Sequence, residues 1–567
     1  MLLFTRAQFH LKRITTDDLK SGMVLSLIAL PLSIGIALAS GAPPTAGLLS
    51  AIIGGILGGL IGGSELAING PAAGLIVIVL GAIDSLGAGD PAVGFHRMLG
   101  CLIIAGMIQI FLGLLKAGKL ALAVPTSVVH GMLMGIGVII MIKQVPVLLG
   151  VTPKSKSIPG VLTELPRILS ETNWEIALIG FFAVSILMVA NMSRARIFNW
   201  IPAPLMVVMM GLGMDYYFDL EHVHQVEFFH RQFLVGPQYL LKLPSEIASS
   251  LFGASFSGLF TGPSLKAIVS IALVASLESI LSVFAIDRMD PERRKSNFNQ
   301  ELISKGVCNM LLGFLGGLPI IAEIVRSSAN ISSGARTRWS NFFHGVFILL
   351  FVLLFKNILG SIPLSALAGI LVVIGFRLGH PRQLLQSWRV GRDQGIVFTM
   401  TLFLTVFEDL LVAVAVGVIL EMVLNAIRAK SLLQIFSLRR ETKYLEDHAE
   451  LTVDSPLVFS NFIQLEESLD ELRKKKSATI DLRKSRMVDH SVMEHLHQLQ
   501  NEFSTAGKNL IIKFHERHRK VGRHPLSSRI VRPRGKRSGW DIHFQQSENM
   551  EEKLGFIKKR DSNESEK

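Results

Sequence analysis

The sequence predicts an α-helical polytopic membrane protein with a small soluble α/β domain at its C-terminal end. Three observations lead to this prediction. Only 18% of the 567 residues are charged and the mean hydropathy is +0.46, whereas a soluble protein carries about 25% charged residues. The shortage of charge is confined to residues 21–430, which contain apolar segments of membrane-spanning length. Two of these segments are interrupted by glycine and proline.

About fourteen apolar segments are predicted transmembrane elements, divided seven and seven by the polar stretch 219–264. The first seven are 22–39, 47–62, 71–86, 95–115, 127–142, 174–190 and 202–218. The second seven are 265–286, 302–315, 320–332, 342–355, 364–376, 395–407 and 410–426. The third and the tenth segments adjoin the glycine-proline interruptions and are expected to continue as short helices, not as full spans.

Basic residues accumulate on one side of these segments. If the N-terminus is cytoplasmic, the inner loops carry clusters at 116–119, 194–196, 288–295, 336–338 and 377–392. The outer loops carry few Lys and Arg, at 154, 156, 167, 231, 242 and 356. This positive-inside pattern predicts both termini in the cytoplasm and a multi-pass protein of the plasma (inner) membrane. No cleavable signal peptide is expected, because residues 1–20 are polar and basic.

The net charge of +13 does not indicate nucleic-acid binding, because the cations lie in loops between apolar spans. We expect the lipid bilayer, and no nucleic acid, as a partner. Cys101 and Cys308 lie in apolar spans without metal-ligand spacing, so we expect packing roles and no metal. No nucleotide-binding loop, metal triad or nucleophile motif is visible, so the chain is not expected to be an enzyme.

The interrupted segments indicate where a solute would bind. The breaks are Asn-Gly-Pro-Ala-Ala-Gly at 69–74 and Gly-Gly-Leu-Pro at 316–319. A broken helix in lipid leaves N–H groups without partners. It is tolerated where it lines a cavity, and there the helix N-terminus attracts an anion. Two such breaks in matching halves of a transporter are a sequence indicator of its substrate site.

The second segment carries two columns of glycine, at 54/58/62 and 55/59/63. Small residues four positions apart let a neighbouring helix approach closely. We expect tight packing here, and a sliding surface is the functional alternative.

Several motifs, in order across about 400 residues, resemble those of the SulP (sulfate permease) anion transporters. In the first half they are LPLS at 30–33, ASGAPPTAGL at 39–48, GGS at 62–64 and GPAA at 70–73. In the second half they are ASLES at 275–279, GGLP at 316–319, RSSAN at 326–330 and GARTR at 334–338. In the tail, ATIDL at 478–482 and MVDHS at 487–491 are similar to a STAS domain, the regulatory module of that family.

The resemblance implies two intertwined inverted repeats of seven spans, a core domain that moves against a gate domain, and a homodimer. The third and tenth elements would be half-helices that face each other around one anion. The expected parts are a cytoplasmic segment 1–20, a transport domain 21–430, a STAS-like domain 440–525 and a basic, disordered tail 526–567.

The resemblance also implies which residues surround the anion. Backbone N–H groups would come from both half-helices, and Arg326 would supply a cation. The substrate-binding candidates are Pro71, Ala72, Ala73, Ala322, Glu323, Ile324, Val325 and Arg326. Many relatives have a hydroxyl residue where this chain has Ala72, so only backbone donors remain there. The alternative for Arg326 is a side chain that extends to the aqueous interface.

Glu278 lies mid-span, four residues before Ser282 and on the same helix face. A carboxylate at this depth is costly unless it is paired, protonated or in contact with water. By resemblance, Glu278, Ser279 and Ser282 would hold a co-transported Na⁺ or carry H⁺. A Glu bonded to a neighbouring helix is the structural alternative.

Glu323 departs from the family pattern, because many relatives have a small residue there. It is three residues before Arg326, so the two side chains could form an ion pair. If Glu323 and Glu278 both face the cavity, their like charges favour a bound proton. We therefore hypothesise proton-linked anion uptake, with a simple salt bridge as the alternative.

Strand-like and helix-like segments alternate in the tail, with helices expected at 462–474 and 492–504 and strands at 457–459, 479–482 and 510–513. STAS domains often have a phosphorylatable Ser at a strand-to-helix turn, where this chain has Ser491. A helix cap is the alternative for Ser491. The basic run 529–537 would be attracted to anionic lipid.

The function that these features favour is secondary active transport of a small inorganic anion, of the sulfate or bicarbonate class. Transport would be coupled to H⁺ or Na⁺, with no other cofactor. A nucleobase-type proton symporter of the same fold and an anion channel are the alternatives.

Overall fold

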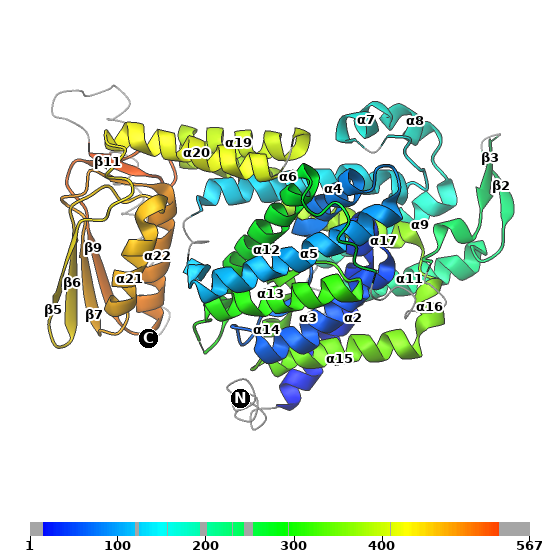
Figure 1. Ribbon diagram of the computed structural model, residues 1–567, viewed down its shortest axis with the longest axis horizontal. Helices are drawn as coiled ribbons and strands as arrows, with labels where there is room; N and C mark the ends of the chain where they lie inside the picture. Colours follow the sequence, from blue (N-terminus) through cyan, green and yellow to red (C-terminus); the bar gives the residue numbers. More distant parts are fainter. Residues whose placement is uncertain are drawn as a thin grey trace, which may run out of the picture.

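The computed structural model describes residues 15–119, 124–155, 157–192, 201–228, 231–242, 253–292, 294–408 and 410–531. Most of the predicted segment 1–20 and of the predicted tail 526–567 lies outside these residues, as do Arg194 and Arg196. The described chain forms a helical body, up to residue 429, and an α/β unit that begins at residue 440. Figure 1 shows the α/β unit at one end of the long axis and a β-hairpin at the opposite end.

Each predicted apolar segment contains a helix of the helical body, and the third and tenth segments also contain residues of a strand. The first half contains α2 (Thr16–Ala39), α3 (Pro44–Ile61), β1 (Ile68–Pro71), η1 (Ala73–Leu75), α4 (Ile76–Leu86), α5 (Pro91–Leu114), α6 (Thr126–Leu148), α9 (Trp174–Met192) and α11 (Ala203–Phe218). The second half contains α12 (Gly262–Met289), α13 (Phe298–Leu315), β4 (Ile320–Glu323), α14 (Ile324–Ser332), α15 (Trp339–Leu354), α17 (Leu364–Leu378), α19 (Arg392–Phe407) and α20 (Leu410–Ala429). Among the described helices, seven are long and apolar enough to cross a membrane. The prediction of a polytopic helical membrane protein is confirmed.

Several short elements lie where only loops were expected. They are α7 (Ile158–Thr163), α8 (Leu165–Ser170), α16 (Lys356–Gly360), α18 (Pro381–Val390) and the hairpin of β2 (His224–Phe228) and β3 (Arg231–Val235), which precedes η3 (Pro237–Tyr239). Their apolar runs are too short for a hydropathy pattern to separate them from loops.

Helices from the two halves of the chain interleave. Helix α5 packs on α13, α3 packs on α15, and α6 packs on α17 and α19. Glycine pairs make three of these contacts close: a Cβ on Gly106 would lie 2.6 Å from the carbonyl oxygen of Gly306. Gly55 contacts Gly345 and Gly137 contacts Gly375 in the same way. Small residues permit such close backbone approach in a membrane, where dispersion forces replace the hydrophobic effect between helices.

Both glycine columns of α3 are used for packing. Gly55 and Gly59 lie against the backbone of α15, whereas Gly54 and Gly58 lie against Asn69 of β1. A Cβ at Gly58 would be 2.6 Å from Nδ2 of Asn69. Small residues on two sides of α3 therefore let it pack closely against a helix on one side and a strand on the other.

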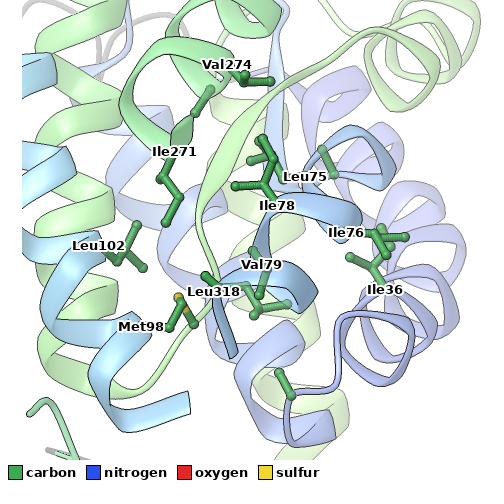
Figure 2. Packing of buried hydrophobic residues seen from close by; sticks show 14 of the residues in the cluster. Ile36, Leu75, Ile76, Ile78, Val79, Met98, Leu102, Ile271, Val274 and Leu318 are labelled. Atoms are coloured by element: carbon green, nitrogen blue, oxygen red, sulfur yellow. The ribbon is translucent and has the colours of Figure 1, made fainter. Parts of the chain in front are cut away.

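The half-helix α4 is enclosed by apolar side chains of its neighbours. Figure 2 shows Ile76 beside Ile36 of α2, and Val79 near Met98 of α5. All four belong to one buried cluster, which also contains Ile271 of α12. This packing holds a helix of 11 residues that could not span the bilayer alone.

The α/β unit has a four-stranded sheet in the order β5 (Arg440–Tyr444), β6 (His448–Val453), β7 (Ser477–Asp481), β9 (Asn509–Lys513). Strands β6, β7 and β9 are parallel. The turn η5 (Phe459–Asn461) precedes α21 (Phe462–Leu472), and β8 (Met487–Val488) precedes α22 (His490–Thr505). A second sheet has the order β10 (His518–Lys520), β11 (Arg529–Val531), β8.

Both helices predicted for the tail are present, as α21 and α22. Strands expected at 479–482 and 510–513 are found as β7 and β9. The strand expected at 457–459 was wrong: Leu457 makes a single bridge with Val488, and η5 begins at Phe459. The segment turns early because Asn461 accepts a hydrogen bond from the N–H of Val458 and closes the turn.

Candidate functional site

The first break and the residues that directly follow the second break meet as a short antiparallel ribbon. Strand β1 pairs with β4, with Ile68 opposite Glu323 and Pro71 opposite Ile320. A strand pair satisfies backbone groups that would otherwise lack partners inside a membrane. The ribbon joins residues from the two halves of the chain, next to the two predicted breaks.

This pairing corrects one prediction. The tenth element was expected to be helical from residue 320, but its helix begins at Ile324. Ile320, Ile321, Ala322 and Glu323 form β4 instead. The N–H of Ala322 donates to the hydroxyl of Ser279 at 3.4 Å, so it is not a free donor for a substrate.

Buried polar side chains from neighbouring helices hold the ribbon in place, and sequence reasoning missed them. The N–H of Ile68 donates to Ser327 at 2.8 Å, and that of Ile320 donates to Asn309 at 2.7 Å. The N–H of Leu318 donates to Ser50 at 2.6 Å. Ser50 is the single Ser of the apolar helix α3, which is a signal that could have revealed it. Ser327 and Asn309 lie in helices with several other polar residues, so their sequence gives no such signal.

Each strand leads directly into a helical segment that has no side-chain cap. Ala72 is the N-cap of η1, which continues into α4, and Glu323 is the N-cap of α14. Neither makes a capping hydrogen bond through its side chain. The first N–H groups of a helix have no partner within it, and they carry a partial positive charge. Two such helix starts therefore flank the ribbon.

Antiparallel pairing puts these two helix starts at opposite ends of the ribbon. Pro71, where β1 ends, is paired with the first residue of β4. Four paired residues span about 10 Å at the usual rise of a strand. The starts differ in exposure, since Ala72 and Ala73 are buried whereas Ile324 and Val325 are 41% and 56% exposed.

Arg326 lies across the ribbon. Its side chain is 1% exposed, and Nη2 donates to the carbonyl oxygen of Pro71 at 3.2 Å. Nη1 lies 3.4 Å from the Ser33 hydroxyl, and it fills the space that a side chain on Gly70 would need. The alternative in which Arg326 extends to the aqueous interface is therefore wrong, because the protein buries this side chain.

Glu323 forms an ion pair with Arg326. The distance from Oε2 of Glu323 to Nε of Arg326 is 2.5 Å, and the Glu323 side chain is 16% exposed. The pair spans one turn, as the spacing of three residues indicated. A buried guanidinium without such a counter-ion would be strongly destabilising.

Glu278 approaches the same place from α12. It is 6% exposed, and its carboxylate lies against the backbone of Gly74, the second residue of η1. The carboxyl group of Glu323 is near enough for the two to repel each other when both are ionised. Ser282 is half-buried one turn further along α12. The ribbon thus brings two carboxyl groups and one guanidinium together.

Ser491, the predicted regulatory residue, lies in the α/β unit. Its side chain is buried, and its hydroxyl accepts a hydrogen bond from the N–H of Thr126 at 3.3 Å. The helix-cap alternative was wrong, because Asp489 is the N-cap of α22 and accepts from the N–H of Val492. Ser491 therefore joins the α/β unit to the first residue of α6.

Residues 16–401 match the model of the sulfate permease family. The chain belongs to this family. It is 29% identical to the putative sulfate transporter YvdB of Bacillus subtilis (strain 168), over 87% of this chain and 90% of that protein. It is 27% identical to the bicarbonate transporter BicA of Picosynechococcus sp. (strain ATCC 27264 / PCC 7002 / PR-6), over 75% and 72% of the two chains.

Two solved structures share the fold. The transmembrane domain of a cyanobacterium bicarbonate transporter BicA aligns with a TM-score of 0.59 and 27% identity, covering 70% of this chain and 97% of that one. The murine Solute Carrier 26 family member A9 anion transporter, in an inward-facing state, aligns with a TM-score of 0.64 and 16% identity, covering 90% and 87%. The second likeness concerns the fold alone. Because the helical body ends at residue 429, that likeness extends into the α/β unit.

Proposed function

We propose that this sulfate permease family member carries a small inorganic anion, of the sulfate or bicarbonate class, across the membrane. The observation that carries the proposal is the β1–β4 ribbon, with an uncapped helix start at each end and a buried guanidinium across it. Backbone N–H groups and helix dipoles suit an anion better than a neutral ring. The names of the relatives, sulfate and bicarbonate transporters, support the same class of substrate.

In this proposal the anion lies between the helix starts. On the α4 side the anion would lie next to Ala72 and Ala73. On the α14 side it would accept hydrogen bonds from the N–H groups of Ile324 and Val325. Arg326 attracts the anion over the ribbon, although its salt bridge with Glu323 offsets part of its charge. In this proposal the anion enters from the side of Ile324 and Val325, because these residues are exposed.

The coupling ion is proposed to be a proton. With Glu278 and Glu323 both ionised, the site holds two negative charges against one positive charge, which opposes an anion. A proton on one carboxyl group makes the site neutral before the anion binds. Na⁺ held by oxygen atoms of Glu278 and Ser282 would have the same electrostatic effect, so the two ions must be separated by experiment.

Transport is proposed to occur by alternating access. The ribbon and its helices α2 to α5 and α12 to α15 would form the core domain. Helices α6, α9, α11, α17, α19 and α20 would form the gate domain. The α/β unit would be a cytoplasmic STAS-like domain with Ser491 as a regulatory residue. A homodimer in the plasma membrane, with both termini in the cytoplasm, completes the proposal.

The test is uptake of labelled sulfate and bicarbonate into proteoliposomes, with an imposed pH gradient and no sodium. The expected result is saturable uptake that rises when the donor side is acidic. Uptake that does not respond to the pH gradient but requires sodium would identify Na⁺, and not H⁺, as the coupling ion. Unitary currents without saturation would indicate a channel, and uptake of nucleobases alone would contradict the anion proposal.

A further inference from the structure

Helix α18 has an apolar exposed face at the boundary of the membrane. It joins α17 to α19, two helices of the helical body, and it carries Arg382 and Arg389, which are expected outside the hydrocarbon region of a bilayer. Leu385 and Trp388 are three residues apart on one face, and they are 58% and 45% exposed. The other side of α18 is attached to the protein, since the Ser387 hydroxyl donates to the carbonyl oxygen of Gln394 at 2.9 Å.

The exposed face of α18 continues into a stripe on α19. Ile396, Met400 and Phe403 are 47%, 41% and 55% exposed, and their spacing puts them on one side of the helix. Such a stripe on a membrane-spanning helix contacts lipid tails. Leu385 and Trp388 therefore lie at the end of a lipid-facing surface, at the depth where Trp side chains prefer the headgroup region.

Exposed arginines surround this apolar face. Arg382 and Arg389 lie on α18, and Arg392 begins α19; all three are exposed. The α/β unit adds Arg523, whose backbone N–H donates to the backbone carbonyl oxygen of Arg389 at 3.0 Å. The acidic residue beside them, Asp393, is paired with Arg428. The positive charge of the cluster is thus not neutralised by its neighbour in sequence.

We propose that α18, with Arg382, Arg389, Arg392 and Arg523, is a binding surface for anionic phospholipid headgroups. Guanidinium groups donate hydrogen bonds to phosphate oxygens, and each basic side chain near an anionic bilayer strengthens binding mainly through its charge. The apolar face favours a bilayer over a soluble phosphate compound, because Leu385 and Trp388 need an apolar environment. This surface is separate from the basic run 529–537, most of which lies outside the described residues.

The surface also connects three parts of the molecule. Helix α18 is continuous with α17 and α19, and its last turn contacts the segment of the α/β unit that contains Arg523 and His524. A Cβ on Gly522 would lie 2.0 Å from the carbonyl oxygen of Val390, so the contact is close. A bound anionic headgroup would hold this junction against the bilayer.

The experiment titrates phosphatidylglycerol into the full-length protein in detergent and follows thermal unfolding. Phosphatidylcholine and soluble glycerol phosphate are titrated in parallel. We expect stabilisation by phosphatidylglycerol only. The variant Arg382→Gln/Arg389→Gln should bind it about 30-fold more weakly. Arg382→Lys/Arg389→Lys keeps the charge and should stay within about threefold of the parent.

The matched control is Lys474→Gln/Lys476→Gln, which removes the same charge from exposed lysines of the α/β unit. It should bind phosphatidylglycerol as the parent does. The proposal is overturned if Arg382→Gln/Arg389→Gln and Lys474→Gln/Lys476→Gln lose the same affinity for phosphatidylglycerol. It is also overturned if Arg382→Gln/Arg389→Gln loses none. Equal stabilisation by phosphatidylcholine would also overturn it, and so would equal stabilisation by glycerol phosphate.

Discussion

The carboxylate of Glu278 occupies the space that a side chain at position 74 would need. A Cβ on Gly74 would lie 2.1 Å from Oε1 of Glu278. The contact joins α12 to the turn that opens α4, so one of the two proposed coupling carboxyl groups lies beside one of the two helix starts. A proton or ion at Glu278 would thus act directly on the proposed anion site.

Gly74→Ala should therefore reduce transport by at least tenfold, because the added methyl group displaces the Glu278 carboxylate. Gly81→Ala is the control in the same half-helix, since a Cβ there meets nothing within 4 Å. The measurement is the initial rate of sulfate uptake at matched protein content. Equal rates for the two variants would show that the contact with Glu278 has no role.

Arg326→Gln should abolish saturable uptake and lower the free energy of unfolding by about 3 kcal/mol, because it leaves the largely buried Glu323 without its partner. The double variant Glu323→Gln/Arg326→Gln removes both charges and should regain most of that stability without regaining transport. Chemical denaturation and uptake assays separate the two effects. Recovery of transport in the double variant would show that the guanidinium does not attract the anion.

Glu278→Gln keeps the shape of the side chain but cannot gain or lose a proton. Uptake should continue down the anion gradient, and accumulation driven by a pH gradient should disappear. Glu421→Gln is the control, because Glu421 is also buried but is bonded to Gln394 on α19. Accumulation that persists in Glu278→Gln would place the coupling elsewhere.

Asp489 should make the stability of the α/β unit depend on pH. Burial raises the pKa of this carboxyl group to about 7, although two backbone N–H groups favour its ionised form. A folded-state pKa above the unfolded value adds stability at low pH that is lost as the pH rises through about 7. Hydrogen exchange of α22 should therefore become faster between pH 5 and 8, after correction for the intrinsic rate. Asp489→Asn should remove this dependence.

Asp470 links the α/β unit to two loops of the helical body. Its carboxylate is 3.0 Å from Nζ of Lys119 and 3.2 Å from Nζ of Lys295. Asp470→Asn should weaken this docking by about 1 kcal/mol, since the groups are partly exposed, and α21 should exchange hydrogen faster. Glu471→Gln is the neighbouring control, because Glu471 pairs with Lys474 of the same unit. Equal exchange in both variants would exclude the link.

The fourteen membrane elements could be predicted because a bilayer imposes length and hydropathy on each segment separately. The Glu323–Arg326 pair could be predicted because it is local: the two residues are three positions apart, at the N-cap and in the first turn of α14. The glycine-proline breaks also indicated that each of these two segments continues as less than a full span.

The ribbon could not be predicted because its partners are far apart in the chain. The run Ile320, Ile321, Ala322 is apolar and would suit a buried helix as well as a strand. Only its pairing with β1 makes it a strand. The burial of Arg326 depends on Pro71 and Ser33, which the chain brings near only after folding. The same holds for Asp470, whose two lysines come from separate loops.

The ribbon has a consequence for how the protein is made. Ile68 is bonded to Ser327, 259 residues later in the chain, so β1 enters the membrane long before its partner strand has been translated. Until then its backbone groups must be shielded by the insertion machinery or by neighbouring nascent helices. The first half is therefore expected to remain incompletely folded until β4 has been synthesised. A chain truncated before β4 is expected to be a substrate for membrane quality control.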